Sequence, residues 1–336
     1  MSIGLFVFVL ALQFLKQGTA VYGQQMIQWF SITNATSTLG FGWLLAYVFL
    51  SGSPVAAVAI SFFASGTLTD LQTFTMITGS RLGASMVVLL VGFVYYLRGY
   101  RQKSSIAIGI LALLTTAAIY VPALIPGYWM LTSGILSPWQ VSASQPLDSW
   151  LDGLITPIID TLGLWLPGWA FLVGGVGALL FSFSLFDRAL PEIDPSQNTS
   201  LITQRLIYNP LAMFCFGALL TSITLSVSVS LSLLVPLSVK GLIRPKHIVP
   251  YIMGANITTF IDTLVAALVV GGTTAFTIVL VEVVSVTLLS LFVLLFCYRP
   301  FEKVLLCTQE LILQSRKTLL LFLGVMLLIP LVLLMV

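Results

Sequence analysis

The chain has 336 residues, of which 58% are hydrophobic and 7% are charged, with a net charge of +3 and a mean hydropathy of +1.08. A soluble domain usually carries about a quarter of charged residues, so this chain has too few charges to cover a water-facing surface. The composition excludes a soluble globular protein, gives no indication of nucleic-acid binding, and predicts an all-α polytopic membrane protein.

The predicted membrane spans are the apolar stretches that approach 20 residues, about the length that a helix needs to cross a bilayer. The first continues past Leu12 and is followed by further hydrophobic segments, so we interpret it as a retained span and not as a cleavable signal peptide. In chain order the spans are 3–20, 71–97, 104–124, 168–186, 248–270, 275–297 and 317–336.

Two further apolar stretches, 40–65 and 206–239, hold small and polar residues near their centres. Polar residues in the middle of a membrane are typical of helical hairpins or broken helices, whose freed backbone groups need protein or water partners. We therefore predict one hairpin in each stretch. The central sequences are Ser51-Gly52-Ser53-Pro54 and Ser226-Val227-Ser228-Val229-Ser230.

Two segments do not fit the pattern of a simple span. Residues 126–166 contain Pro126, Pro138, Pro146 and Pro157, and we expect an irregular connection with one short helix. Whether that helix enters the membrane is left open. Residues 300–316 alternate charged residues with leucine, which is typical of an amphipathic helix at the membrane interface.

An internal repeat appears when the chain is shifted by 175 positions. Between positions 34 and 79, eleven of 46 residues are then identical, with Asn34 on Asn209 and Gly79 on Gly254. Weak internal symmetry of this kind is common in transporters. We therefore expect two related halves.

The basic residues indicate how the two repeats are oriented. The loop 66–70 has no basic residue, whereas its counterpart 240–247 carries three; one loop later the pattern reverses between 98–103 and 271–277. Because basic loops stay in the cytoplasm, equivalent loops lie on opposite sides and the repeats are predicted to be inverted. The expected organisation is a first repeat at 1–125, a connection at 126–166, a second repeat at 167–297, and an amphipathic segment plus final span at 298–336.

The second repeat contains three motifs with small and polar residues: Gly217-Ala218-Leu219-Leu220-Thr221, Leu225-Ser226-Val227-Ser228 and Gly254-Ala255-Asn256-Ile257-Thr258-Thr259. These motifs resemble those of the type II sodium/phosphate cotransporter family, whose repeats carry a Q-S-S-S hairpin followed by a G-A-N-I-G-T-T segment. The resemblance implies sodium-coupled phosphate uptake. This chain departs from the pattern with Leu50 and Leu225 at the glutamine positions and with Arg81 at the asparagine position of the first repeat.

The candidate ligands for Na⁺ or an oxyanion are side-chain oxygens and amides in these motifs. Half-helix N-termini at a hairpin break add positive potential for an anion. The alternative is a structural role, in which serines bond back to helix carbonyls or allow close packing and the other polar side chains hydrogen-bond between helices. The candidates are Ser51, Ser53, Ser226, Ser228, Asn256, Thr258 and Thr259.

Ionisable residues within the spans form a second group of candidates. Arg81 either contacts the substrate through a bidentate bond or forms an ion pair with Asp262, at a similar depth in the symmetry-related span. A fixed positive charge at this position would also be able to replace a coupling cation. Glu282 is a candidate for binding a cation or proton, and Asp160 is a weaker one.

The function expected from these features is sodium-coupled symport of a small inorganic oxyanion, with phosphate as the leading substrate. The alternatives are another anion or proton coupling in the same architecture, and a membrane sensor or assembly partner that has lost transport. The serines have no histidine base within the membrane, so we expect no enzyme; no cofactor and no metal other than Na⁺ are expected. Expected partners are phosphate, Na⁺ and the lipid bilayer of the bacterial inner membrane, without nucleic acid, and a homo-oligomer is compatible with the sequence.

Overall fold

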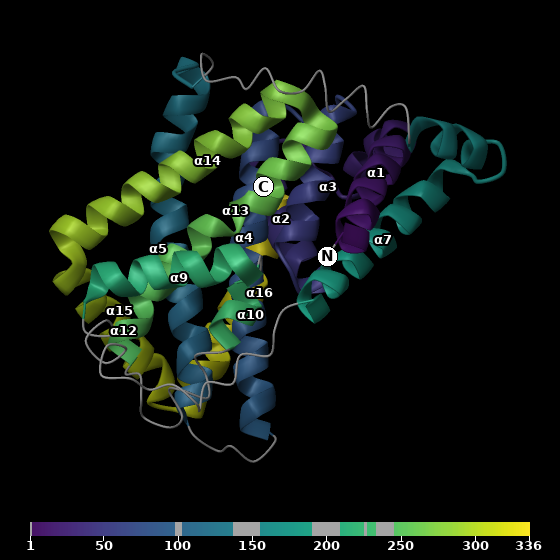
Figure 1. Cartoon of the computed structure of the whole chain (residues 1–336). Helices are drawn as coiled ribbons and strands as arrows, with labels where there is room; N and C mark the ends of the chain where they lie inside the picture. Colours follow the sequence, from purple (N-terminus) through teal and green to yellow (C-terminus); the bar gives the residue numbers. More distant parts are fainter. Residues whose placement is uncertain (1, 98–102, 137–154, 190–208, 225–226, 233–244) are drawn as a thin grey trace.

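The computed structural model describes residues 2–97, 103–136, 155–189, 209–224, 227–232 and 245–336, and every regular element within these ranges is a helix (Figure 1). A backbone surrounded by lipid has no water to bond and must satisfy its own hydrogen bonds. Long apolar stretches of this chain therefore form helices, and the prediction of an all-α fold is confirmed for the described residues.

Up to residue 136, the described residues form five helices. The longest three exceed the expected spans at one or both ends, because apolar and helix-compatible residues continue beyond the most hydrophobic window. The helices are α1 (Ser2–Trp29), α2 (Ala35–Phe49), α3 (Ser53–Ala64), α4 (Asp70–Leu97) and α5 (Lys103–Ser133).

The second half is divided into more and shorter segments. Residues 155–163 are helical, and two single-turn π segments interrupt the long helical run near the C-terminal end. The elements are α7 (Gly168–Ala189), α9 (Pro210–Thr224), α10 (Val227–Ser232), α12 (Pro245–Thr258), α13 (Phe260–Ala266), η2 (Ala267–Gly271), α14 (Gly272–Phe292), η3 (Val293–Cys297), α15 (Tyr298–Leu313) and α16 (Arg316–Met335).

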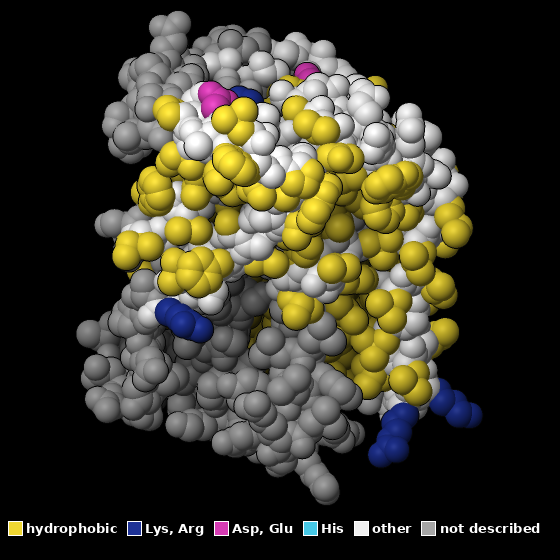
Figure 2. Space-filling view, turned by 90° about the vertical axis from the view of Figure 1, so that its right-hand side faces the viewer, with side chains coloured by type: hydrophobic (Ala, Val, Ile, Leu, Met, Phe, Trp, Pro, Cys, Tyr) yellow, Lys and Arg dark blue, Asp and Glu magenta, His cyan; other side chains and the backbone are white. Residues whose placement is uncertain are grey.

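Five helical stretches in the described residues are long and apolar enough to cross a membrane: Ile3–Trp29, Ile106–Ser133, Gly168–Leu185, His247–Leu313 and Arg316–Met335. The prediction of a polytopic membrane protein is confirmed at this level. The span expected at 71–97 is helical throughout as α4 but is not among the five. Figure 2 shows a broad hydrophobic surface on the side formed by α1 and α7, where Ile3, Phe6, Val173 and Phe181 are exposed. Such a surface is suited to lipid and not to water.

The expected hairpin at 40–65 is a pair of helices, α2 and α3, joined by a three-residue break. Leu50 ends α2 in the left-handed conformation with φ 52°, and Pro54 occupies the first turn of α3. Proline is favoured there because its missing N–H is not needed. The helical pair begins earlier than predicted, since Asn34 caps α2 by accepting a hydrogen bond from the Ser37 N–H.

Helix α5 corrects the expected boundary of the irregular connection. It continues through Pro122 and Pro126 to Ser133, so residues 126–133 are helical and not irregular. At the two prolines the helix lies partly open, since Pro122 is exposed and Pro126 is half-buried, and each proline lacks the N–H that would continue the helical hydrogen bonds. Most of the remaining connection, 137–154, lies outside the described residues.

The same helix contact occurs twice, 175 residues apart. Helix α2 packs against α4, and α9 packs against α12. A Cβ on Gly79 would clash with the Leu39 carbonyl oxygen, and a Cβ on Gly254 would clash with the Phe214 carbonyl oxygen. Gly254 and Phe214 are the residues that follow Gly79 and Leu39 by 175 positions. Glycine therefore allows close backbone approach at equivalent places in the two helix pairs.

Candidate ion-binding site

A buried arginine lies where α3, α4 and α13 meet. The side chain of Arg81, on α4, is 6% exposed. Its Nη1 donates to Ser53 Oγ at 3.4 Å, and its Nη2 donates to the Thr259 carbonyl oxygen at 3.3 Å and to Thr263 Oγ1. The guanidinium also lies 4.5 Å from the centroid of the Phe260 ring, a cation–π distance. Arg81 therefore joins the first hairpin to the second half of the chain.

Asp262 on α13 balances the charge of Arg81. Its Oδ1 lies 3.8 Å from Arg81 Nη2, at the outer limit of an ion pair, and its side chain is 5% exposed. Among the described residues, Arg81 Nε and Asp262 Oδ2 have no hydrogen-bond partner. A buried pair is stable only when its remaining donors and acceptors are satisfied. The pair thus retains one free donor and one free acceptor in its present geometry.

Interruptions in two helices bring these groups together. The break before α3 lies so close to α4 that a Cβ on Gly52 would come 2.9 Å from the Ser80 carbonyl oxygen. This approach places Ser53, the first residue of α3, beside Arg81. A second interruption at Thr259 separates α12 from α13, and the carbonyl at that point accepts from Arg81.

The best-matching motif residues form a neighbouring polar cluster. Asn256 Nδ2 donates to Thr116 Oγ1 on α5 at 2.9 Å, and the Asn256 carbonyl accepts from the Tyr120 hydroxyl at 2.9 Å. Thr259 Oγ1 donates to the same carbonyl at 2.9 Å. The Tyr120 ring stacks on Phe260 at 6.2 Å between centroids. The Asn256 amide nitrogen and the Thr259 hydroxyl are thus hydrogen-bonded within the protein, next to the Arg81 cluster.

Glu282 on α14 is buried in a separate polar contact. It is 1% exposed, and its Oε1 and Oε2 lie at hydrogen-bond distances of 2.7 and 2.9 Å from the Thr78 hydroxyl on α4. The only ion pair in the described part of the chain is the one between Arg81 and Asp262. Glu282 is therefore a buried carboxyl without a salt-bridge partner among those residues.

The remaining candidate residues from the sequence lie outside the clusters around Arg81, Asn256 and Glu282 or outside the described residues. Ser51 is half-buried in the break between α2 and α3, and Thr258 is half-buried with its hydroxyl 3.4 Å from the Ala255 carbonyl oxygen. Asp160 is exposed in the helix at 155–163, away from the buried cluster. Ser226 and the side chain of Ser228 lie outside the described residues.

Sequence reasoning missed the residues that complete the two clusters. Thr263 follows Asp262 directly, and Thr78 lies one turn before Arg81, so proximity along a helix was a usable signal for both. Thr116 and Tyr120 belong to α5, which no motif singled out. Their role depends on the packing of α5 against α12, which sequence spacing does not reveal.

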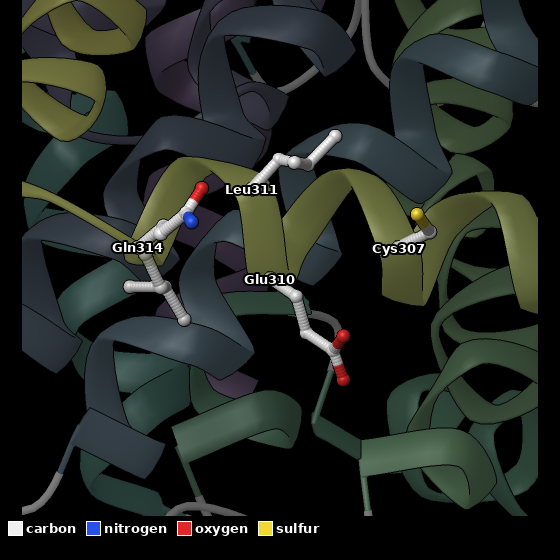
Figure 3. A pocket seen from close by; sticks show the side chains of 5 residues that line it. Cys307, Glu310, Leu311 and Gln314 are labelled. Carbon is white, nitrogen blue, oxygen red and sulfur yellow. The ribbon is translucent and has the colours of Figure 1, made fainter.

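The described residues contain no group of three or more His, Cys, Asp or Glu side chains suited to a metal ion. A surface cavity of about 410 Å³ lies along α15 and is lined by Cys307, Glu310, Leu311, Leu313 and Gln314 (Figure 3). None of these side chains belongs to the Arg81 or Glu282 clusters, so the cavity is not part of the candidate site.

No protein-family model matches this chain, and no curated protein or solved structure matches it significantly. The resemblance to the sodium/phosphate cotransporters therefore rests on the sequence motifs alone.

Proposed function

We propose that this chain is a secondary active transporter of the inner membrane that carries a small inorganic oxyanion, phosphate by resemblance, together with sodium. The observation that carries the proposal is the half-satisfied ion pair of Arg81 and Asp262. Ionisable residues at membrane depth are costly and usually functional. Here they stand at two helix interruptions, where transporters place their binding sites.

The free atoms of the pair suit the two proposed ligands. Arg81 Nε has no partner among the described residues and would donate to an oxyanion, whose geometry matches a guanidinium. Asp262 Oδ2 is likewise without a partner, and together with the Ser53 hydroxyl it offers the oxygen ligands that Na⁺ requires. At a separation of 3.8 Å the pair makes no close bidentate contact that a ligand would have to break.

The course of the helices supports an inverted arrangement of the two repeats. Gly271, at the end of η2, lies against Ile60 and Phe63 near the end of α3, shortly before α4 begins. The run from α12 to η2 thus ends on the side of the molecule where α4 starts. Since these two stretches are equivalent under the 175-residue shift, the proposed repeats run in opposite directions. This is the geometry used for alternating access.

A second candidate function is sensing or assembly without transport. It is favoured by the neighbouring cluster, in which the Asn256 side chain donates to Thr116 and the Thr259 hydroxyl donates to a backbone carbonyl. A transporter must open this cluster in each cycle, whereas a sensor needs only to bind.

Competition in proteoliposomes tests the proposed substrate and separates the two candidates. Radiolabelled phosphate uptake is measured under an inward sodium gradient, with unlabelled phosphate, sulfate or a small carboxylate added outside. We expect phosphate to compete best. Strongest competition by a carboxylate would replace phosphate as the substrate, and binding without uptake would favour the sensor.

A further inference from the structure

We infer that Glu282 binds a proton in the present state of the protein and is a proton-coupling site, separate from the Arg81 cluster. The inference rests on the proposed transport function, because proton movement is coupled to the movement of a transported solute. It adds a proton to the ions carried and assigns it to a named carboxyl.

Counting hydrogens at Thr78 supports a protonated Glu282. The Thr78 hydroxyl lies 3.0 Å from the Phe74 carbonyl oxygen and 2.7 and 2.9 Å from the two Glu282 oxygens. A hydroxyl has one hydrogen to donate, so Thr78 can offer an ionised Glu282 only a hydrogen that it shares with Phe74. If Glu282 carries the proton, one carboxyl oxygen donates to Thr78, and Thr78 donates to Phe74. Each of these two hydrogen bonds then has a hydrogen of its own.

Burial supports the same assignment. Glu282 is 1% exposed, and an isolated carboxylate in such a place is far costlier than a neutral acid. Its only side-chain hydrogen-bond partner in the described part of the chain is the Thr78 hydroxyl. A single neutral donor does not compensate for a buried negative charge, whereas a proton removes the charge altogether.

The charged and titratable groups on the neighbouring helices are committed to other contacts. Arg81 on α4 acts on Glu282 only at a distance, since its closest carboxylate is Asp262 on α13. The Tyr120 hydroxyl on α5 donates to the Asn256 carbonyl. Among the described side chains, α3 and η2 carry no titratable group. The remaining groups on packed elements are Asp70 on α4 and Tyr128 on α5, both exposed, His247 and Tyr251 on α12, and Cys297 at the end of η3.

The position of the contact suits coupling. Thr78 lies three residues before Arg81 on α4, so the proton site and the oxyanion site share one helix. A proton taken from the outer water by the Glu282 carboxylate and released to the inner water would change the contact between α4 and α14 in each cycle. Oxyanion and proton then move in the same direction.

Proteoliposomes with equal sodium concentrations on both sides test the inference. Radiolabelled phosphate uptake is driven by an inward pH gradient, and phosphate exchange is measured in parallel without a gradient. The matched control is Glu310→Gln, which changes an exposed glutamate on α15. We expect the wild type and Glu310→Gln to respond to the pH gradient, and Glu282→Gln to lose this response while exchange persists. A wild type that exchanges phosphate but ignores the pH gradient would overturn the proton site and leave the transport proposal intact.

Infrared spectroscopy of the purified protein provides a measurement that does not depend on transport. A protonated carboxyl has a carbonyl stretch that a carboxylate lacks. We expect such a band in the wild type at neutral pH, its loss in Glu282→Gln, and its retention in Glu310→Gln. A spectrum that Glu282→Gln leaves unchanged would show that the proton is not on Glu282, whether or not phosphate is transported.

Discussion

Arg81 Nη2 and Asp262 Oδ1 lie 3.8 Å apart between α4 and α13, with both side chains more than nine-tenths buried. The two residues come from opposite halves of the chain, and each is placed beside a helix interruption. Their separation is long for a charge-assisted hydrogen bond, and each keeps one polar atom without a partner among the described residues. These two unpartnered atoms are the ones proposed to bind the oxyanion and Na⁺.

Removing one member of the pair is expected to cost more stability than removing both. Arg81→Gln leaves a buried aspartate without its cation, which typically costs about 3–5 kcal/mol. The double variant Arg81→Gln with Asp262→Asn contains no buried unpaired charge and should unfold closer to the wild-type temperature. Thermal unfolding in detergent measures the difference. A double variant less stable than Arg81→Gln would contradict the ion pair.

The Thr78 side chain is expected to matter through its hydroxyl group and not through its bulk. Thr78→Val keeps the shape but removes the only side-chain hydrogen-bond partner of Glu282 among the described residues, and an unsatisfied buried group costs about 1–3 kcal/mol. Thr78→Ser keeps the hydroxyl and should restore most of the stability. We expect the unfolding temperature to fall clearly in Thr78→Val. Equal effects of the two substitutions would indicate that only packing is at work.

The two glycine contacts between equivalent helices are expected to be sensitive to a single methyl group. Gly79→Ala and Gly254→Ala place a Cβ against the backbone of α2 and α9, respectively, and overpacking typically costs about 1–3 kcal/mol. Gly177→Ala in α7 is the matched control, because no atom lies within 4 Å of a Cβ there. Unfolding temperatures should fall in the first two and stay near the wild-type value in the third.

Thiol labelling tests the inverted topology. In a variant whose three cysteines are replaced by serine, single cysteines are introduced as Thr69→Cys and Leu242→Cys, in loops related by the 175-residue shift. The positive-inside rule places the first outside and the second in the cytoplasm. A membrane-impermeant thiol reagent added to intact cells should therefore label only Thr69→Cys. Labelling of both or of neither from one side would contradict inversion.

Much of the helical fold followed from apolar length, because lipid leaves a chain few alternatives to helices. The break at 50–52 was also predictable, since the sequence there is small, polar and followed by proline. The extension of α5 through Pro122 and Pro126 was not, because proline disfavours the interior of a helix, yet the chain continues as one helix to Ser133. The inverted repeats remain a prediction.

The candidate site was predictable to a lesser degree. The pairing of Arg81 with Asp262 was one of two alternatives, because a buried charge needs a partner and Asp262 lies at a similar depth. The contact of Glu282 with Thr78 was missed, since it joins residues 204 positions apart and no motif connects them. The motifs did not distinguish phosphate from a carboxylate substrate, because a guanidinium binds both with the same donors.

The measurement that tests the central claim most directly is radiolabelled phosphate uptake into proteoliposomes with and without an inward sodium gradient. Ser53→Ala and Asn256→Ala are compared with Thr308→Ala, which alters an exposed threonine on α15. We predict sodium-stimulated uptake in the wild type and in Thr308→Ala, and at least a several-fold reduction in the other two. A wild type that takes up no phosphate above protein-free liposomes under either condition would contradict sodium-coupled phosphate transport.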